Sequence, residues 1–296
     1  SKAYGIFMAQ LRDNWDFLSE KEKRQFMSSV LLNLEIYQSY NLANSGMSDS
    51  SGMLAFDIEL NRKGILLQSI KATRESILAS GDTSQNYSLV GWGYNGYGQT
   101  EVPAGNDFVS IASAGFHNLA LRCNGTVASW GSNWHGESDA PQENTFAEVA
   151  TGQFHSLALR SNGTIVAWGS NRYGQTSVPP EPEFTYIGIA AGCFHSLALR
   201  ANGSIACWGS NSYGQCNVPL ENDFQAVAAG QHHSLGLRLN GSIACWGDNS
   251  MGQCNVPAGN DFIAIAAING YHSLALRSNG RIVAWGSNDY GESTAP

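Results

Sequence analysis

The chain has 296 residues, of which 24 are acidic and 16 are lysine or arginine, and its formal net charge is −8. Every lysine precedes residue 87, so residues 87–296 form an acidic, lysine-free region, which argues against binding to nucleic acid or to anionic membranes. No apolar run approaches the roughly 20 residues that span a bilayer. No N-terminal signal sequence is visible either, so we expect a cytoplasmic location.

Residues 1–86 are predicted to form an α-helical segment of two to three helices. Ser19 to Glu22 fits a capping box, with a serine at the N-cap and a glutamate three residues later. Apolar residues then recur at helical spacing, at Phe26, Met27, Val30, Leu31, Leu34 and Tyr37. A further helix is expected from Leu54 to Ala79. The simplest interpretation is a helical hairpin or bundle that packs on the remaining chain or links it to something upstream.

Part of this segment has a familiar sequence. The stretch from Phe56 to Leu67, continuing to Asp82, resembles the helical segment that precedes the protease domain of bacterial CHAT (caspase-like) proteins, and the likeness extends over residues 20–82. The protease itself does not follow, because a different region begins at residue 87. The resemblance therefore implies a multi-domain bacterial protein or a shuffled relative of one, and it does not imply proteolysis by this chain.

Residues 87–296 repeat with a nearly fixed period. Trp-Gly pairs occur at intervals of 38 to 40 residues, at Trp92, Trp130, Trp168, Trp208, Trp246 and Trp285. Histidines keep the same interval at His117, His155, His195, His233 and His272. A period of this length predicts a repeat architecture in which each unit buries its apolar face against the next.

Each repeat is predicted to contain four short strands. In residues 224–257 these are Phe-x-x-Val-Ala-Ala, His-Ser-Leu-x-Leu-Arg, Ser-Ile-Ala-Cys-Trp and the segment that ends in Asn-Val-Pro. Asn-Gly lies between the second and third strands of each repeat, and this pair is a strong signal for a tight hairpin. Large residues such as Leu157 and Leu159 alternate with small ones, which favours sheets stacked face to face as the blades of a β-propeller.

The repeat unit also identifies a family. Its pattern, Ala-Ala-Gly-x-x-His-Ser-Leu-Ala-Leu-Arg-x-Asn-Gly-x-Ile-x-x-Trp-Gly-x-Asn-x-x-Gly-Gln-x-x-Val-Pro, resembles the regulator of chromosome condensation / beta-lactamase inhibitory protein II repeat superfamily. The resemblance extends over residues 87–296 and implies a mainly β fold, a β-propeller. The likeness of the Trp-Gly half to the inhibitory protein implies that one face of the propeller can block an enzyme.

Closure of the propeller is left open by the sequence. The third and fourth strands occur once more often than the first two, because the repeat region begins at Leu89 to Trp92 with a third strand and ends at Pro296 after a fourth. Two arrangements fit: a ring of five full repeats with a spare hairpin, or a sixth blade whose first two strands are missing or supplied elsewhere.

The repeated histidines and cysteines are expected to be structural. Each histidine begins a second strand and could bond to backbone across the adjacent loop, and no acidic residue shares the histidine spacing. We therefore expect no catalytic residue, no metal site and no cofactor. Cys207 and Cys245 each precede a cysteine by nine residues. Disulfides within a blade are one interpretation, but sister repeats have serine, alanine or threonine there, so reduced thiols are expected.

Four Asn-Gly-Thr/Ser triplets match the glycosylation sequon. The hairpin requires Asn-Gly in any case, so we interpret the match as coincidence.

The variable positions of the repeat predict a binding surface. In an up-and-down blade, the loops between strands 1 and 2 and between strands 3 and 4 emerge on one face, while the opposite face should be uniform. Aromatic and long side chains vary within these loops, and loops on a rigid scaffold are common binding sites. The candidate partner-binding residues are Tyr97, Trp134, His135, Arg172, Tyr173, Tyr213, Met251 and Tyr290 in the 3–4 loops, and Phe116, Phe154, Phe194, His232 and Tyr271 in the 1–2 loops.

These observations predict a non-enzymatic module, an α-helical segment at 1–86 followed by a propeller at 87–296, which binds another protein through the aromatic loops. Three alternatives stay open: an enzyme inhibitor of the beta-lactamase-inhibitor type, a target-recognition module of a CHAT-type defence or signalling protein, and a carbohydrate-binding propeller. Nucleotide exchange on a small GTPase is disfavoured, because no repeat carries a long insertion.

Overall fold

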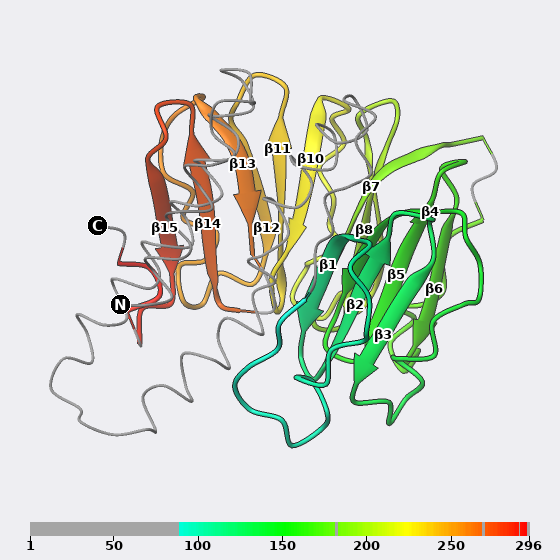
Figure 1. Ribbon diagram of the computed structural model, residues 1–296. Coiled ribbons are helices and arrows are strands. Elements are labelled where there is room, and N and C mark those ends of the chain that lie inside the picture. The colour runs from blue at the N-terminus through cyan, green and yellow to red at the C-terminus, as the bar shows by residue number, and fades with distance from the viewer. Residues whose placement is uncertain (1–88, 181–182, 268–269, 290, 295–296) are drawn as a thin grey trace, which may run out of the picture.

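The computed structural model describes residues 89–180, 183–267, 270–289 and 291–294 (Figure 1). The helices expected within residues 1–86, and Tyr290 of the predicted binding surface, lie outside the described residues. The described chain is built of antiparallel strands and loops, and it contains no helix long and apolar enough to cross a membrane.

The strands form five sheets of three, here called blades 1 to 5. Blade 1 contains β1 (Phe108–Ala114), β2 (His117–Arg122) and β3 (Val127–Gly131), and blade 2 contains β4 (Phe146–Thr151), β5 (His155–Arg160) and β6 (Ile165–Gly169). Blade 3 contains β7 (Tyr186–Ala191), β8 (His195–Arg200) and β9 (Ile205–Gly209). Blade 4 contains β10 (Phe224–Ala229), β11 (His233–Arg238) and β12 (Ile243–Gly247), and blade 5 contains β13 (Phe262–Ala266), β14 (His272–Arg277) and β15 (Ile282–Gly286).

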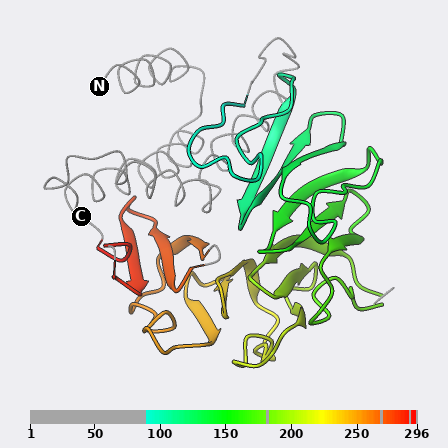
Figure 2. The same cartoon turned by 90° about the horizontal axis from the view of Figure 1, so that it is seen from below.

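The blades stand radially around a common axis. Figure 2 looks along this axis and shows the blades following one another along an arc, with blades 1 and 5 at its two ends. The first strand of each of blades 1 to 4 packs beside the first strand of the next blade, so the first strands lie nearest the axis. This arrangement confirms the predicted propeller of stacked, similar sheets.

Packing between blades places large side chains against small ones, as the alternation predicted. Leu119 and Leu121 of blade 1 share a buried cluster with Ala158 of blade 2, and all three side chains are fully buried. Leu157 and Leu159 of blade 2 pack in the same way with Ala198 of blade 3. Burial of a leucine side chain contributes about 2 kcal/mol, so each blade is stabilised mainly by its neighbours.

The Asn-Gly hairpins form as expected. In blade 2, Gly163 has a φ of +81°, and its amide donates to the carbonyl of Arg160 at 2.9 Å. The Asn162 side chain accepts hydrogen bonds from the backbone amide and the hydroxyl of Thr164, at 3.1 and 2.8 Å. The threonine or serine of each sequon-like triplet therefore has a conformational role in the turn.

The predicted fourth strand is wrong. The segments that end in Val-Pro carry no strand in any of the described repeats. Their backbone donors are used locally instead: the amide of Ser177 bonds to the carbonyl of Gly174 and that of Val178 to the carbonyl of Thr176, both at 3.0 Å. The following proline has no donor at all. The segment therefore closes the outer edge of the blade without a strand ladder, and the edge offers few free donors to another strand.

The expectation of reduced cysteines is also wrong. Disulfides join Cys207 to Cys216 and Cys245 to Cys254, with Cα–Cα distances of 5.3 and 5.2 Å. Each links the third strand of a blade to the edge segment, which the folded blade brings to bonding distance although the residues are nine apart in sequence. In blade 1, a hydrogen bond joins the same two segments, because Ser129 Oγ donates to the carbonyl of Ser138.

Cysteine labelling provides a direct check of these bonds. We expect an alkylating reagent, added without reductant, to modify Cys123 rapidly because its side chain is exposed. Cys193 is buried and donates to the Gln153 side chain at 2.6 Å, so it should react only after unfolding. Peptide mass mapping should recover the other four cysteines as two linked pairs, and their rapid labelling in the folded protein would contradict the structure.

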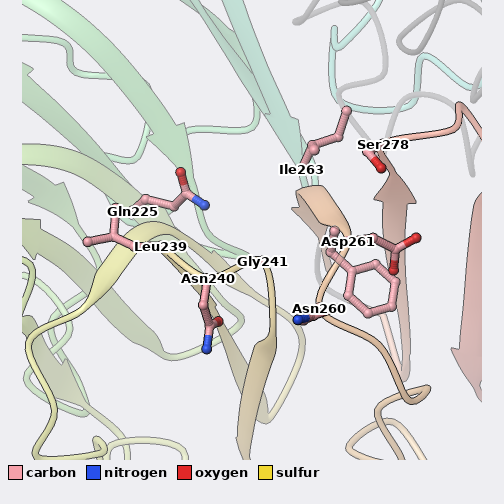
Figure 3. Close-up of a pocket in the computed structure, with 9 residues that line it drawn as sticks. Gln225, Leu239, Asn240, Gly241, Asn260, Asp261, Ile263 and Ser278 are labelled. Atoms are coloured by element: carbon pink, nitrogen blue, oxygen red, sulfur yellow. The ribbon is translucent and has the colours of Figure 1, made fainter.

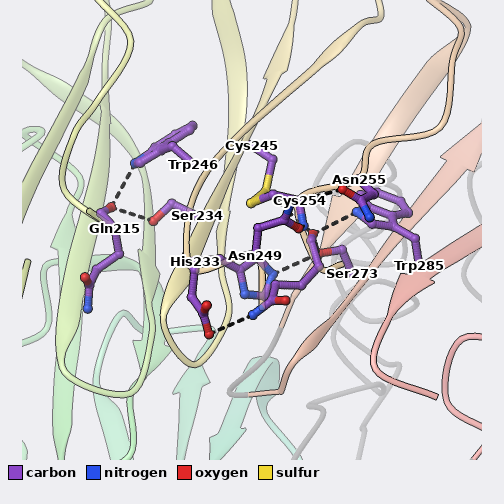
Figure 4. The surroundings of a disulfide bond; sticks show 12 residues. Gln215, His233, Ser234, Cys245, Trp246, Asn249, Cys254, Asn255, Ser273 and Trp285 are labelled. Atoms are coloured by element: carbon purple, nitrogen blue, oxygen red, sulfur yellow. Dashed lines mark hydrogen bonds between the residues drawn. A yellow bond between two sulfur atoms is a disulfide. The ribbon is translucent and has the colours of Figure 1, made fainter. Parts of the chain in front are cut away.

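A repeated polar network fastens each blade to the next. Gln215 lies in the edge segment of blade 3. Its carbonyl accepts hydrogen bonds from two groups of blade 4, Trp246 Nε1 at 2.8 Å and Ser234 Oγ at 2.9 Å (Figure 4). Gln99, Glu137, Gln175 and Gln253 play the same role for the tryptophans Trp130, Trp168, Trp208 and Trp285. The regular spacing of the tryptophans in the sequence therefore reflects this hydrogen-bonded joint between neighbouring blades, which recurs once in each repeat.

The histidines take part in the same joint. Sequence analysis assigned them a structural role with backbone partners, but the side-chain partner is a serine hydroxyl of the following blade. His155 Nε2 lies 3.0 Å from Ser196 Oγ, and His195 Nε2 lies 3.0 Å from Ser234 Oγ. Ser196 donates its only proton to the carbonyl of Gln175, so it accepts from Nε2–H of a neutral His155.

Residues 89–103 form a half repeat that stacks on blade 1. The Gln99 carbonyl accepts hydrogen bonds from Trp130 Nε1 at 2.9 Å and from Asn118 Nδ2 at 3.0 Å, as the glutamines of complete blades do. The half repeat therefore occupies the place of a preceding blade's outer part. The strand expected at Leu89 to Trp92 is not formed, since a strand needs a neighbour and the described residues include no second strand of this repeat.

Candidate partner-binding surface

The two sets of variable loops lie together at one end of the propeller. This is the lower end in Figure 1, toward which the arrows of β3 and β15 point. We define the aromatic rim by the described candidates: Tyr97, Phe116, Trp134, His135, Phe154, Arg172, Tyr173, Phe194, Tyr213, His232, Met251 and Tyr271. The thirteenth candidate, Tyr290, lies outside the described residues.

The backbone of the 3–4 loops is held by residues that do not vary. In blade 2, Asn171 Oδ1 accepts the amide of Thr176 at 3.0 Å, and Gln175 Oε1 accepts the amide of Tyr173 at 2.9 Å. Equivalent bonds to a glutamine or glutamate side chain fix the amides of Tyr97, His135, Tyr213 and Met251. The frame is therefore rigid and constant, while the side chains that it presents change from blade to blade.

The 1–2 loops contribute an inner row of rings. Phe116, Phe154, Phe194 and His232 are partly buried and follow one another around the axis, with neighbouring centroids 6.1 to 6.4 Å apart. Tyr271 continues the row at 6.3 Å from His232. This row lies near the axis, because each ring lies in the loop that joins a first strand to a second strand and the first strands are nearest the axis.

The 3–4 loops contribute an outer row that leans on the inner one. Ring centroids are 5.0 Å apart for Tyr97 and Phe116, 5.1 Å for Tyr173 and Phe194, and 4.5 Å for Tyr213 and His232. These separations lie in the range of favourable aromatic pairs. The two rows form one continuous surface, and the structure brings together all the described aromatic candidates.

The outer side chains remain open to solvent despite these contacts. Trp134 is 67% exposed, Tyr173 46%, Tyr213 55% and Met251 50%. Packing of the loops alone would bury these groups, so their exposure is not explained by the fold. Sequence analysis missed one member of the surface: Tyr94 is 42% exposed and lies 6.1 Å from Tyr97. It occupies the position that serine or aspartate takes in the other repeats, a difference that the alignment of repeats could have shown.

The titratable groups of the described residues show no reactive cluster. Burial lowers the pKa of His117 and His233 to about 4 and that of His155 and His195 to about 3, so these histidines are neutral and inaccessible at pH 7. Burial also lowers the pKa of His232 in the rim, and the nearby Asp248 carboxylate opposes this effect. Within the described residues, no group of His, Cys, Asp and Glu is arranged to hold a metal ion.

The opposite face is less uniform than expected. A groove of about 460 Å³ lies between the Asn240-Gly241 turn of blade 4 and the segment that leads into β13 of blade 5 (Figure 3). Leu239 and Ile263 line it and are exposed, whereas its carboxylate, Asp261, is paired with Arg277. The groove is open and has no free charged group among its lining residues, so it is a weaker candidate site than the rim.

Comparisons with known proteins agree on the repeat. Residues 146–175, 186–215, 224–253 and 262–292 each match the family model of the regulator of chromosome condensation (RCC1) repeat. No curated protein matches the chain.

Solved structures resemble the propeller. The ectodomain of the receptor kinase CR4 from Physcomitrella patens is 30% identical over 66% of this chain, with a TM-score of 0.54, and the chain spans only 55% of that ectodomain. The CRINKLY WD40 ectodomain of the Arabidopsis thaliana receptor kinase ACR4 is 21% identical over 69% of this chain and 73% of its own length, with a TM-score of 0.52. Prp20p from Saccharomyces cerevisiae, characterised for its binding to Gsp1p and histones, is 22% identical over 69% of both chains, with a TM-score of 0.57. At these identities the latter two show the fold alone.

Proposed function

The repeats of this chain belong to the RCC1 repeat superfamily, and from this premise we propose that the chain is a non-enzymatic interaction module that binds a partner protein through its aromatic rim. Propellers of this kind commonly mediate protein–protein interactions. Membership of this superfamily supports protein binding as the general activity, and the exposed side chains of the rim support this face as the binding surface.

The exposure of large side chains on a fixed frame carries the proposal. Trp134, Tyr173 and Tyr213 are each about half exposed or more, although their backbone amides or their ring neighbours are held in place. Rigid aromatic residues lose little conformational entropy on binding and dominate the energetics of many interfaces. Such a surface fits a protein partner that covers several blades at once.

A non-enzymatic role agrees with the chemistry of the rim. General acid–base catalysis needs titratable groups that reach a substrate, but the repeated histidines are buried in the joints between blades. Of the carboxylates near the loops, Asp248 is engaged by Ser250 and Gln253. The rim is better suited to cover a partner's surface than to transform a substrate.

The two disulfides bear on the compartment. Disulfides persist in oxidising surroundings and are rare in the reducing cytosol. We therefore place the module in an oxidising compartment, contrary to the cytoplasmic location that sequence analysis favoured, on the strength of the Cys207–Cys216 and Cys245–Cys254 bonds.

A triple substitution tests the binding face. We expect W134A/Y173A/Y213A to weaken binding of the partner about 100-fold or more, because each exposed anchor typically contributes 1 to 2 kcal/mol at an interface. The partner is first captured from the source organism with the unaltered chain as bait, and its affinity for each variant is then measured by calorimetry. The protein should stay folded, since the three side chains lie at the surface and each lost ring pair costs only about 0.5 to 1.5 kcal/mol.

The matched control replaces three apolar side chains of similar fractional exposure that lie outside the rim. I187A/L239A/I263A replaces side chains that are 55%, 69% and 52% exposed outside the rim, and it should leave the affinity within twofold, roughly the scatter of near-neutral interface positions. An equal loss of affinity for the partner in both triple variants would contradict the proposal. Tight, saturable binding of a sugar on a glycan array, abolished by the rim substitutions, would favour the carbohydrate-binding alternative instead.

A further inference from the structure

The blade 1 end of the rim differs from the rest in its charge as well as its rings. Resting on the proposed function, we propose that this end is a receptor for a cationic side chain, an arginine or lysine that the partner protein places against the exposed face of Trp134, beside Tyr97. Two independent features of the described residues support a positively charged group of the partner at this place, namely exposed aromatic rings and nearby carboxylates.

The first feature is an open corner of aromatic rings. Tyr97 and Trp134 meet nearly at right angles, with centroids 5.0 Å apart and an angle of 85° between their planes. Phe116 supports Tyr97 from below at 5.0 Å, and Tyr94 stands edge-on to it at 6.1 Å. Trp134 is the most exposed ring of the rim, at 67%. Perpendicular rings leave the face of one of them open, and the negative face of an exposed indole attracts ammonium and guanidinium groups.

The second feature is a pair of carboxylates beside the same loops. Glu101 bonds to Asn95 at 3.4 Å, and Asp139 bonds to Asn133 at 2.8 Å. Each carboxylate also lies against the glycine that follows the variable residues, Gly98 and Gly136. The equivalent position carries Ser177, Asn217, Asn255 and Thr294 in the following repeats, so the acidic pair belongs to this end of the rim alone.

Among the described residues, neither of these carboxylates forms an ion pair with a basic side chain. The ion pairs of the described residues join Arg122, Arg160, Arg238 and Arg277 to Asp107, Glu143, Glu221, Asp223 and Asp261. Those acidic residues lie in the connections that lead to the first strands, on the face away from the rim. Arginine thus pairs with the acidic groups of the far face, whereas no arginine of the described residues pairs with Glu101 or Asp139.

The remaining charged groups near the loops do not reverse this picture. Asp248 and Asp289 add negative charge in blades 4 and 5, and Arg172 is the basic residue of the rim, in blade 2. Its guanidinium lies 5.7 Å from the ring of Tyr173, on which it already packs. An incoming cation therefore meets its most favourable surroundings at Trp134, whose exposed ring belongs to the same end of the rim as Glu101 and Asp139.

The experiment uses the full chain and defined peptides. The probe is acetyl-(Gly-Arg)₃-amide, with the citrulline peptide as its uncharged counterpart and the lysine peptide as a second cation, titrated by calorimetry at low and high salt. We expect the arginine peptide to bind saturably, with an affinity that falls as the salt concentration rises. The citrulline peptide should bind at least tenfold more weakly. W134A should reduce the affinity roughly tenfold, as expected when a cation loses its ring.

Charge-matched variants separate the site from the overall field. E101Q/D139N should reduce the affinity for the arginine peptide severalfold, whereas E183Q/E221Q, which removes two carboxylates on the face away from the rim, should leave it unchanged. Equal effects of the two double variants, equal binding of the arginine and citrulline peptides, or no binding of either would overturn the inference. If capture of the partner depends on the three rim aromatics but is indifferent to E101Q/D139N, the inference fails and the proposed function stands.

Discussion

Acidification from pH 7 to pH 5 is expected to remove roughly 8 kcal/mol of folding free energy, enough to unfold the propeller. His117, His155, His195 and His233 are buried, and burial lowers their pKa values to about 4, 3, 3 and 4. In the unfolded chain the same groups titrate near 6.5. The stability they contribute is fully present above pH 6.5 and falls as the pH drops from there toward 4, by about 2 kcal/mol per histidine at pH 5.

The structure explains why the protonated forms are excluded. Nε2 of each of these histidines already faces a serine oxygen, and Nδ1 has no hydrogen-bond partner among the residues that the structure describes. A proton on Nδ1 would place an uncompensated charge in the joint between two blades. Urea denaturation at pH 7, 6 and 5 measures the effect. H195Q should reduce the loss of folding free energy between pH 7 and pH 5 by about 2 kcal/mol, the contribution of one buried histidine. H135Q, at an exposed position, should leave this loss unchanged. A folding free energy that stays constant from pH 7 to pH 5 would contradict the prediction.

Replacement of Gly192 by alanine is expected to destabilise the protein by about 1 to 3 kcal/mol, the usual cost of overpacking a core site. An added Cβ would stand 2.6 Å from Nδ1 of His195 and 2.5 Å from the carbonyl oxygen of Gly230, and closer still to Cε1 of the same imidazole. The imidazole cannot move aside without breaking its bond to Ser234, and the Gly230 carbonyl is backbone of the next blade. The change therefore disturbs the joint between blades 3 and 4 directly.

Gly188, in β7 of the same blade, provides the matched control. A Cβ added there meets nothing nearer than Leu199 Cβ at 3.7 Å, an ordinary contact, so G188A should change the stability by less than about 1 kcal/mol. Thermal unfolding of both variants beside the parent measures the difference. Similar melting temperatures for G192A and the parent would show that the joint is looser than the contacts of His195 indicate.

Much of the fold was predictable because the repeat encodes it locally. The Asn-Gly pair requires a residue with positive φ, and Gly163 shows the conformation that its sequence implies. The alternation of Leu157 and Ala158 was enough to predict stacked blades, since large and small residues must meet across each joint. The positions of the rim residues followed from the same reasoning, because an up-and-down blade leaves only two places for its variable loops.

Other features depended on which atoms the folded chain brings together. The Val-Pro segment has the composition of a strand, but local hydrogen bonds satisfy its amides. The histidines were correctly assigned a structural role, yet their partner is a serine about 40 residues away, in the next blade. The cysteine spacing allowed either redox state, and only the closeness of the third strand to the edge segment decides for a disulfide.

The sequence by itself determined the period, the hairpins and the loops that carry the aromatic side chains, because these depend on backbone preferences and on contacts within one repeat. The tertiary structure decided which rings remain exposed, which carboxylates stay without an arginine and how each blade is fastened to the next. The contact of Trp134 with Tyr97 and the bond of His195 to Ser234 join different repeats, and their energies depend on distances that no single repeat specifies.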